Sequence, residues 1–176
     1  MIATDVYLIV LRILHIGAGV AWAGGVFLFV VFVQPSAAAI APQGAPFIRE
    51  LVGSRRLIDR ILTIAAVSIV GGALLYWELW RDAGGLGDFL GTSYGVVLTI
   101  GALAALTAFV IGLFGTRPAV QQMLALGAQM AQAEGPPPPE LATQMQAVQG
   151  RLKVLARTGL GLLTVAVLAM ATARYW

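Results

Sequence analysis

An unbroken uncharged run from Ile13 to Val33 constrains this chain more than any other feature of its sequence. A helix rises about 1.5 Å per residue, so a run of this length crosses the roughly 30 Å hydrocarbon core of a bilayer. Three further uncharged runs follow, at 61–77, 89–116 and 158–173. The last one spans a bilayer if Arg157 and Arg174 extend their charged ends to the two interfaces.

With their apolar flanks, the runs predict an all-α fold, a four-transmembrane-helix bundle with spans at about 6–33, 57–80, 89–116 and 153–174. The composition agrees, because 59% of the residues are hydrophobic and 11% are charged, with a mean hydropathy of +0.88. Soluble domains average about 25% charged residues. We therefore expect residues 1–176 to form a single integral membrane domain whose main partner is the lipid bilayer.

The residue types present exclude several functions. No basic run with interleaved aromatic residues occurs, so we expect no nucleic-acid partner. The chain has no cysteine, which removes disulfides, thiolate metal sites and covalently attached haem. No acid–base pair or nucleophile constellation is visible within the spans, so the sequence does not establish whether the protein is an enzyme. Because the first uncharged run is about twice the length of a signal-peptide core, we expect the first span to be retained.

The basic residues predict an orientation. Eight of them flank the connections after spans one and three: Arg49, Arg55, Arg56, Arg60, Arg117, Arg151, Lys153 and Arg157. The other side has three: Arg12, Arg81 and Arg174. The positive-inside rule then places both termini outside the cytoplasm, in an inner-membrane, multi-pass protein. Trp77, Trp80, Tyr175 and Trp176 would form an aromatic belt at the outer interface.

Two segments between the spans carry helical patterns. Residues 46–56 place apolar side chains among arginines, which predicts a short helix at the inner headgroup boundary, where Arg55, Arg56 and Arg60 meet anionic lipid. Residues 118–152 carry two apolar stripes separated by a Gly- and Pro-rich turn at 134–139. These stripes predict a cytoplasmic helical hairpin that extends spans three and four, with an outer surface suited to docking a membrane or cytoplasmic protein partner.

The first span also contains His15, the single histidine of the chain. Helical spacing places His15, Gly19 and Trp22 on one face, with Arg12 one turn nearer the membrane surface. Gly17, Ala21 and Gly25 form a second stripe of small residues, which predicts close approach of a neighbouring helix along that stripe. An ionisable group inside the membrane is costly, so His15 needs either a structural partner or a function.

Both interpretations of His15 remain open. In the structural one, a neutral imidazole bonds to a carbonyl or hydroxyl on a neighbouring helix, and Arg12 pairs with Glu78. In the functional one, His15 ligates a metal or a haem iron, Arg12 neutralises a haem propionate, and Met170 is a second axial ligand. Trp22 would then be packing or a wall of the same pocket. A homodimer would bring a second His15.

A family resemblance supports the functional interpretation. Leu14, His15, Trp22, Gly24 and Gly25 form the pattern L-H-x6-W-x-G-G, which resembles the first-span signature of small membrane proteins related to copper-resistance protein D (CopD) and of HemJ-type protoporphyrinogen oxidases. The S-R-R-L pattern at 54–57 and the chain end M-A-T-A-R-Y-W at 170–176 extend the resemblance.

In the HemJ-like group, the resemblance implies a haem b held by the first-span histidine, with a further histidine and a lysine in later spans. In the CopD-like group it implies movement of copper. This chain contains His15 alone, and its single lysine, Lys153, lies at the edge of span four. Three functions are therefore expected, in this order: a haem b or metal protein with a redox or electron-transfer role, a non-catalytic subunit that docks a partner through 118–152, and a copper transporter.

Overall fold

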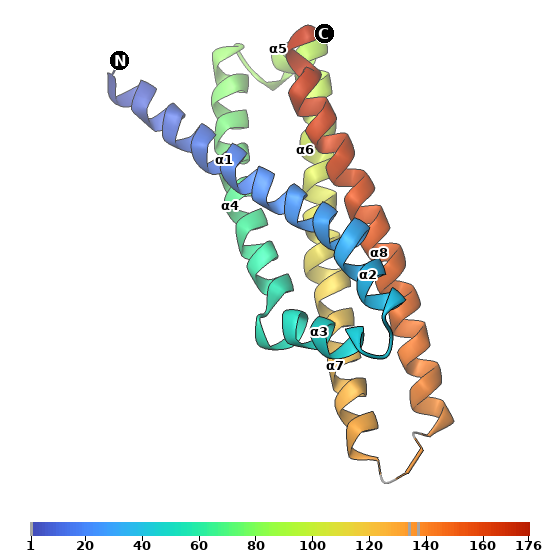
Figure 1. Ribbon diagram of the computed structural model, residues 1–176. Helices are drawn as coiled ribbons and strands as arrows, with labels where there is room; N and C mark the ends of the chain where they lie inside the picture. The colour runs from blue at the N-terminus through green and yellow to red at the C-terminus, as the bar shows by residue number, and fades with distance from the viewer. Residues whose placement is uncertain (1, 134, 137) are drawn as a thin grey trace.

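The computed structural model describes residues 2–133, 135–136 and 138–176, and this part of the chain is helical with no strand. Four helices are long and apolar enough to cross a membrane: Val6–Ala39, Leu57–Asp82, Ser93–Gln132 and Pro139–Tyr175. The prediction of four apolar helices long enough to cross a membrane is confirmed. In Figure 1 the chain ends lie at one end of the bundle, and the connection between α7 and α8 lies at the other. We call these the terminal side and the hairpin side.

The first long helix contains a change of helical pitch. It consists of α1 (Ile2–Leu28), a π-helical segment η1 (Phe29–Val33) and α2 (Gln34–Ala39). Pro35 has no amide hydrogen, and its ring clashes with the carbonyl four residues earlier in an α-helix. The wider π turn, in which the Gln34 amide bonds to the Phe29 carbonyl, precedes that proline. The helix therefore extends past the span limit of residue 33 predicted from the sequence.

The helix predicted for 46–56 is present as α3 (Gly44–Arg49) continued by a second π-helical segment, η2 (Glu50–Ser54). Its buried side is Val52, and Gly53 lies against Leu124. Arg56 then adopts a left-handed backbone conformation with φ of 51° and precedes the second long helix, α4 (Leu57–Asp82). This short helix is therefore held against the helix that follows the third span.

The third span starts later than the sequence predicted. Residues 86–90 form a separate short helix, α5 (Leu86–Leu90), and α6 (Ser93–Val110) begins after it. The boundary is set by Thr92, which has an extended backbone and whose hydroxyl accepts a hydrogen bond from the Gly95 amide at 3.0 Å. This is an N-cap, which satisfies one amide that the first helical turn leaves unpaired.

The third and fourth long helices run antiparallel. α6 continues through a third π-helical segment, η3 (Ile111–Thr116), into α7 (Arg117–Gln132), and Pro118 sits in the first turn of α7. After the connection, α8 (Pro139–Thr172) runs back along α7 and α6 and ends in a 3₁₀ turn, η4 (Ala173–Tyr175). Glu134 and Pro137 of the predicted turn lie outside the described residues.

Small residues form the centre of the bundle. The core cluster consists of Trp22, Ala65, Ala104, Ala105, Ala108, Leu163 and Ala166. Trp22 is 5% exposed, and its ring meets the Phe109 ring edge-on at 6.4 Å. Because lipid provides no hydrophobic drive for helix association, close approach at alanines increases the dispersion contacts between helices. Ala104 and Ala108, one helical turn apart on α6, contribute to this packing.

Candidate functional site

His15 lies where α1 crosses α4, and its side chain is partly buried there. The ring nitrogen Nδ1 is 2.8 Å from the carbonyl oxygen of Ser68 on α4. In return, the Ser68 hydroxyl donates to the His15 carbonyl oxygen at 3.0 Å. Ser68 is 4% exposed, so these two bonds satisfy polar groups that would otherwise be buried between helices. This is the hydrogen bond expected of the structural interpretation.

Glycines on both helices allow this close contact. A Cβ atom on Gly72 would lie 2.7 Å from Cε1 and 2.8 Å from Nδ1 of His15, closer than real Cβ atoms approach. A Cβ on Gly19 would lie 3.1 Å from the Ser68 hydroxyl. The imidazole therefore occupies the space that a side chain at residue 72 would need, and this seam depends on glycine at that position.

The hydrogen bond to Ser68 also determines the tautomer of the neutral imidazole, that is, which ring nitrogen carries the hydrogen. A carbonyl oxygen only accepts, so Nδ1 carries the hydrogen when this bond forms. In the neutral ring, Nε2 then holds the lone pair and is the atom that could ligate a metal. Histidines that bind metals commonly have this arrangement, with the other ring nitrogen donating to a carbonyl or carboxylate. The local geometry is thus compatible with both interpretations of His15.

The small-residue stripe predicted at Gly17, Ala21 and Gly25 is not the seam between α1 and α4. A Cβ added at Gly17 would meet no atom within 4 Å, and Ala21 is exposed. At Gly25 the nearest atom would be Cδ1 of Ile61, at 3.9 Å. That prediction was wrong at Gly17 because the face with His15 and Gly19 allows hydrogen bonds as well as close approach.

Arg12 does not pair with Glu78. The Glu78 carboxylate instead accepts from Arg81, one turn along α4. Arg12 itself has an exposed side chain, and no ion pair involving it is found among the described residues. The short i to i+3 spacing within α4 lets Arg81 reach Glu78 without crossing to another helix. Arg12 keeps its predicted place, one helical turn from His15 on α1.

Met170 and His15 pack against different helices. Met170 lies on α8, where its Cγ would be 3.2 Å from a Cβ on Gly101 of α6. It packs against the core cluster that contains Trp22. His15 packs on α4. Met170 therefore contributes to the α6–α8 contact, and the structure does not bring the predicted axial pair onto one interface.

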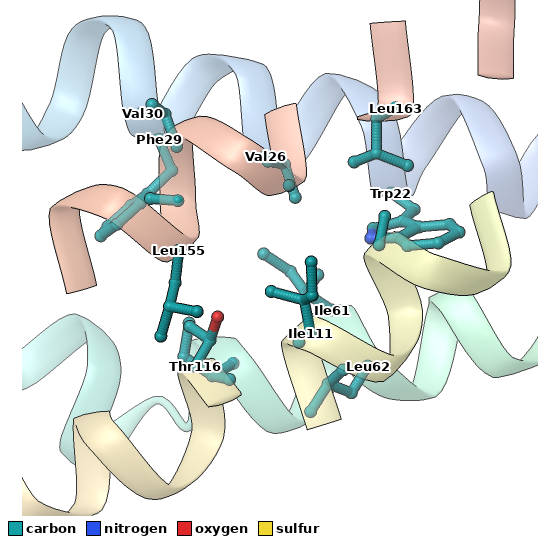
Figure 2. Close-up of a pocket in the computed structure, with 15 residues that line it drawn as sticks. Trp22, Val26, Phe29, Val30, Ile61, Leu62, Ile111, Thr116, Leu155 and Leu163 are labelled. Atoms are coloured by element: carbon teal, nitrogen blue, oxygen red, sulfur yellow. The ribbon is translucent and has the colours of Figure 1, made fainter. Parts of the chain in front are cut away.

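A hollow that the sequence did not predict begins at Trp22 and extends toward the hairpin side. Its volume is about 100 Å³, and Figure 2 shows side chains from α1, α4, η3 and α8 around it. The lining residues include Trp22, Val26, Phe29, Ile61, Ile111 and Leu155. Two of the π-helical segments, η1 and η3, contribute to the lining. The available sequence signal was a proline shortly after each segment, Pro35 and Pro118.

An ionic cluster lies beside the hairpin-side end of the hollow. The Asp59 carboxylate accepts from Arg56 at 3.0 Å and from Arg117 at 2.8 Å. The second of these bonds joins the start of α4 to the start of α7. Among the described residues, no group of three or more His, Cys, Asp and Glu side chains is placed to hold a metal ion.

Comparison of the chain with protein-family models, with curated proteins and with solved structures gave no match.

Proposed function

We propose that the chain is a multi-pass inner-membrane protein that holds haem b, or a metal in its place, through Nε2 of His15 and acts in a redox or electron-transfer step. The observation that supports this most directly is the bond from Nδ1–H to the Ser68 carbonyl at 2.8 Å. It orients the ring and leaves Nε2 as the acceptor, which is the arrangement seen in histidine ligands. The resemblance of the L-H-x6-W-x-G-G pattern to CopD- and HemJ-like proteins points the same way.

His15 would supply one protein ligand to such a group. Gly72 leaves space for the imidazole edge, and Arg12, one turn toward the terminal side, provides a positive charge suited to a propionate. Bound haem b supplies a one-electron couple whose potential depends on its axial ligands and surroundings. Met170 packs against α6, so a second protein ligand would have to come from elsewhere, such as His15 of a second copy in a homodimer.

An absorption spectrum of the detergent-solubilised protein tests the proposal. We expect a Soret band that His15→Ala abolishes. Gly72→Ala should also weaken it, because the new Cβ would strike Cε1 and Nδ1 of the ring, while Gly71→Ala is the matched control. A Cβ at Gly71 would meet only ordinary contacts with His15, at 3.4 to 3.5 Å. A colourless, metal-free protein after expression with added haem precursor would contradict the proposal.

The second candidate is a non-catalytic membrane subunit that docks a partner through residues 118–152. One observation favours it: this segment exposes a series of uncharged polar side chains, namely Gln121, Gln122, Gln129, Gln132, Gln144, Gln146 and Gln149. Such a surface suits solvent and reversible polar contacts. A colourless protein whose unfolding temperature is the same in wild type and His15→Gln would favour this candidate over haem binding.

We also propose that the hairpin side faces the cytoplasm, because eight of the eleven basic residues flank it. The chain has no cysteine, so single-cysteine variants give clean labelling. Gln129→Cys in α7 should react with an impermeant maleimide only after cells are opened, and Tyr175→Cys in η4 should react in intact spheroplasts. Labelling in the opposite order would overturn the assigned orientation.

A further inference from the structure

The hollow between α1, α4, η3 and α8 is built into the backbone of the two π-helical segments. Pro35 and Pro118 each follow a segment in which the helix widens, and both segments line the hollow. Wide π turns interrupt regular ridge-into-groove packing and occur often at functional sites. Apart from Thr116 and the indole of Trp22, the lining side chains are apolar. This lining offers few polar partners to water, so a molecule that enters the hollow must be apolar.

Charged residues lie at the hairpin-side end of this hollow. Ile58 and Thr116 line the hollow, and each is followed in the chain by a charged residue, Asp59 and Arg117 respectively. Asp59 and Arg117 pair with each other at 2.8 Å, and Arg56 pairs with the second oxygen of Asp59 at 3.0 Å. The carboxylate thus holds two guanidinium groups beside the end of the hollow.

Lys153 belongs to the same level of the bundle. Gly115 lies against Leu155, where a Cβ would be 3.2 Å from Cδ2, and Gly127 lies against Met145. This antiparallel register places residue 117 of α7 opposite residues 153–155 of α8. Lys153 is exposed and one turn before Ala156, which lines the hollow. Arg56, Arg117 and Lys153, with Arg60 and Arg157 one turn further along α4 and α8, outnumber the single carboxylate of Asp59, so this level carries a net positive charge.

We propose that the hollow and these cations form a site for one anionic phospholipid, with part of an acyl chain in the hollow and the headgroup phosphate on Arg117 and Lys153. An alkyl chain matches the apolar lining, and a volume of about 100 Å³ accommodates a short length of chain. A phosphate forms strong charge-assisted bonds with guanidinium and ammonium groups. Basic clusters next to a membrane helix favour anionic over zwitterionic headgroups. The site requires no cofactor at His15.

Native mass spectrometry of the full chain, released from nanodiscs with equal amounts of phosphatidylglycerol and phosphatidylcholine, tests the headgroup. We expect one retained lipid, mostly phosphatidylglycerol. Lys153→Gln should lower the ratio of retained phosphatidylglycerol to phosphatidylcholine about fivefold, as expected for one basic residue at a membrane surface. Arg174→Gln removes the same charge on the terminal side and should leave the ratio unchanged. Equal retention of the two lipids by wild type would overturn the proposal.

A second pair of variants tests the acyl chain. Gly159 lines the hollow and Gly161 is exposed two residues further along α8, and a Cβ at either position would meet no atom within 4 Å. Gly159→Leu should fill the hollow and reduce the retained lipid at least fivefold, whereas Gly161→Leu should retain as much as wild type. The unfolding temperature of each variant verifies folding. Equal retention by the two folded variants, or a retained isoprenoid in place of a phospholipid, would contradict the proposed occupant.

Discussion

α1 meets α4 in two regions that differ in kind. Around His15 the two helices are held together by hydrogen bonds in both directions, and Gly72 brings the α4 backbone against the imidazole. Toward the hairpin side the same helices line a hollow of about 100 Å³, surrounded by larger aliphatic and aromatic side chains. Hydrophobicity is high in both regions, so it does not set how closely the helices approach. In the first region the helices approach closely because Gly72 has no Cβ atom. In the second, the π-helical segments before Pro35 and Pro118 leave space between the helices.

Hydrogen bonds and close packing are two separate sources of stability between apolar helices. Hydrogen bonds between membrane helices contribute only about 0.6 kcal/mol each on average, because the polar groups also find partners when the helices are apart. Packing at glycine and alanine contributes through many small dispersion contacts. The His15 seam combines both contributions, whereas the hollow lacks contacts along its inner surface. Substitutions of the same chemical type should therefore have opposite effects in the two regions.

The largest effect is expected for Gly72→Ala. The added methyl would lie 2.7 Å from Cε1 of His15, so the ring or the helices must move apart. Overpacking of this kind destabilises by about 1–3 kcal/mol, which exceeds the helix-propensity gain of about 1 kcal/mol for replacing glycine with alanine. Denaturant unfolding in detergent, followed by circular dichroism, measures the change in the free energy of unfolding.

Gly159→Ala is the matched substitution at the hollow, where the new Cβ meets open space. Here the propensity gain is not opposed by a clash, so we expect the free energy of unfolding to stay the same or rise by up to about 1 kcal/mol. If Gly72→Ala and Gly159→Ala lost equal stability, the closely packed region at His15 and the hollow would not differ in the way described.

A smaller loss is expected for Ser68→Ala. The variant loses the hydroxyl bond to the His15 carbonyl at 3.0 Å but keeps the Ser68 carbonyl that accepts from Nδ1. Bonds between membrane helices contribute about 0.6 kcal/mol on average and at most about 1.7 kcal/mol. Thr107→Ala is the control, since that exposed hydroxyl bonds only within its own helix, to the Leu103 carbonyl. A larger loss of stability for Thr107→Ala in the same unfolding assay would mean that the Ser68 hydroxyl does not stabilise the contact between α1 and α4.

The smallest effect is expected for Asp59→Asn beside the hollow. Its carboxylate has two arginine partners, but the side chains are 32% exposed at Asp59 and 43% at Arg117, so solvent screens the pairs. A loss of about 0.2–0.5 kcal/mol at low ionic strength should largely disappear near 1 M salt, where the screening length is about 3 Å. Glu50→Gln, at the more exposed Arg55 pair, should give no measurable change. A loss that does not depend on salt would mean that Asp59 acts through packing.

The sequence predicted the spans well because long uncharged runs have few alternatives in a chain of this composition. It placed the start of the third span too early, at residue 89, since Phe89 and Leu90 are apolar enough to join the span and only the Thr92 cap separates them from it. The face with His15, Gly19 and Trp22 was read correctly from helical spacing, and Ser68 and Gly72 carry the small side chains of a seam. The choice of seam on α1 was wrong at Gly17.

The partner of His15 could not have been predicted from residue types, because Nδ1 bonds to a backbone carbonyl, and every residue has one. The neighbours of Met170 were equally hidden, since the position of a residue along its own helix says nothing about which helix it faces. The hollow was missed for a related reason: a proline marks a change of helical pitch, but the space that results depends on which helices surround it.

By itself, the sequence determined that four apolar helices form and that one imidazole lies within the first, because length, charge and helical period act along a single segment. Only the tertiary structure decided that Ser68 and Gly72 hold that imidazole, that Met170 packs elsewhere, and that two π segments line the same hollow. Those outcomes depend on crossing angle and register between helices. They arise from the sum of many weak contacts, which no single segment encodes.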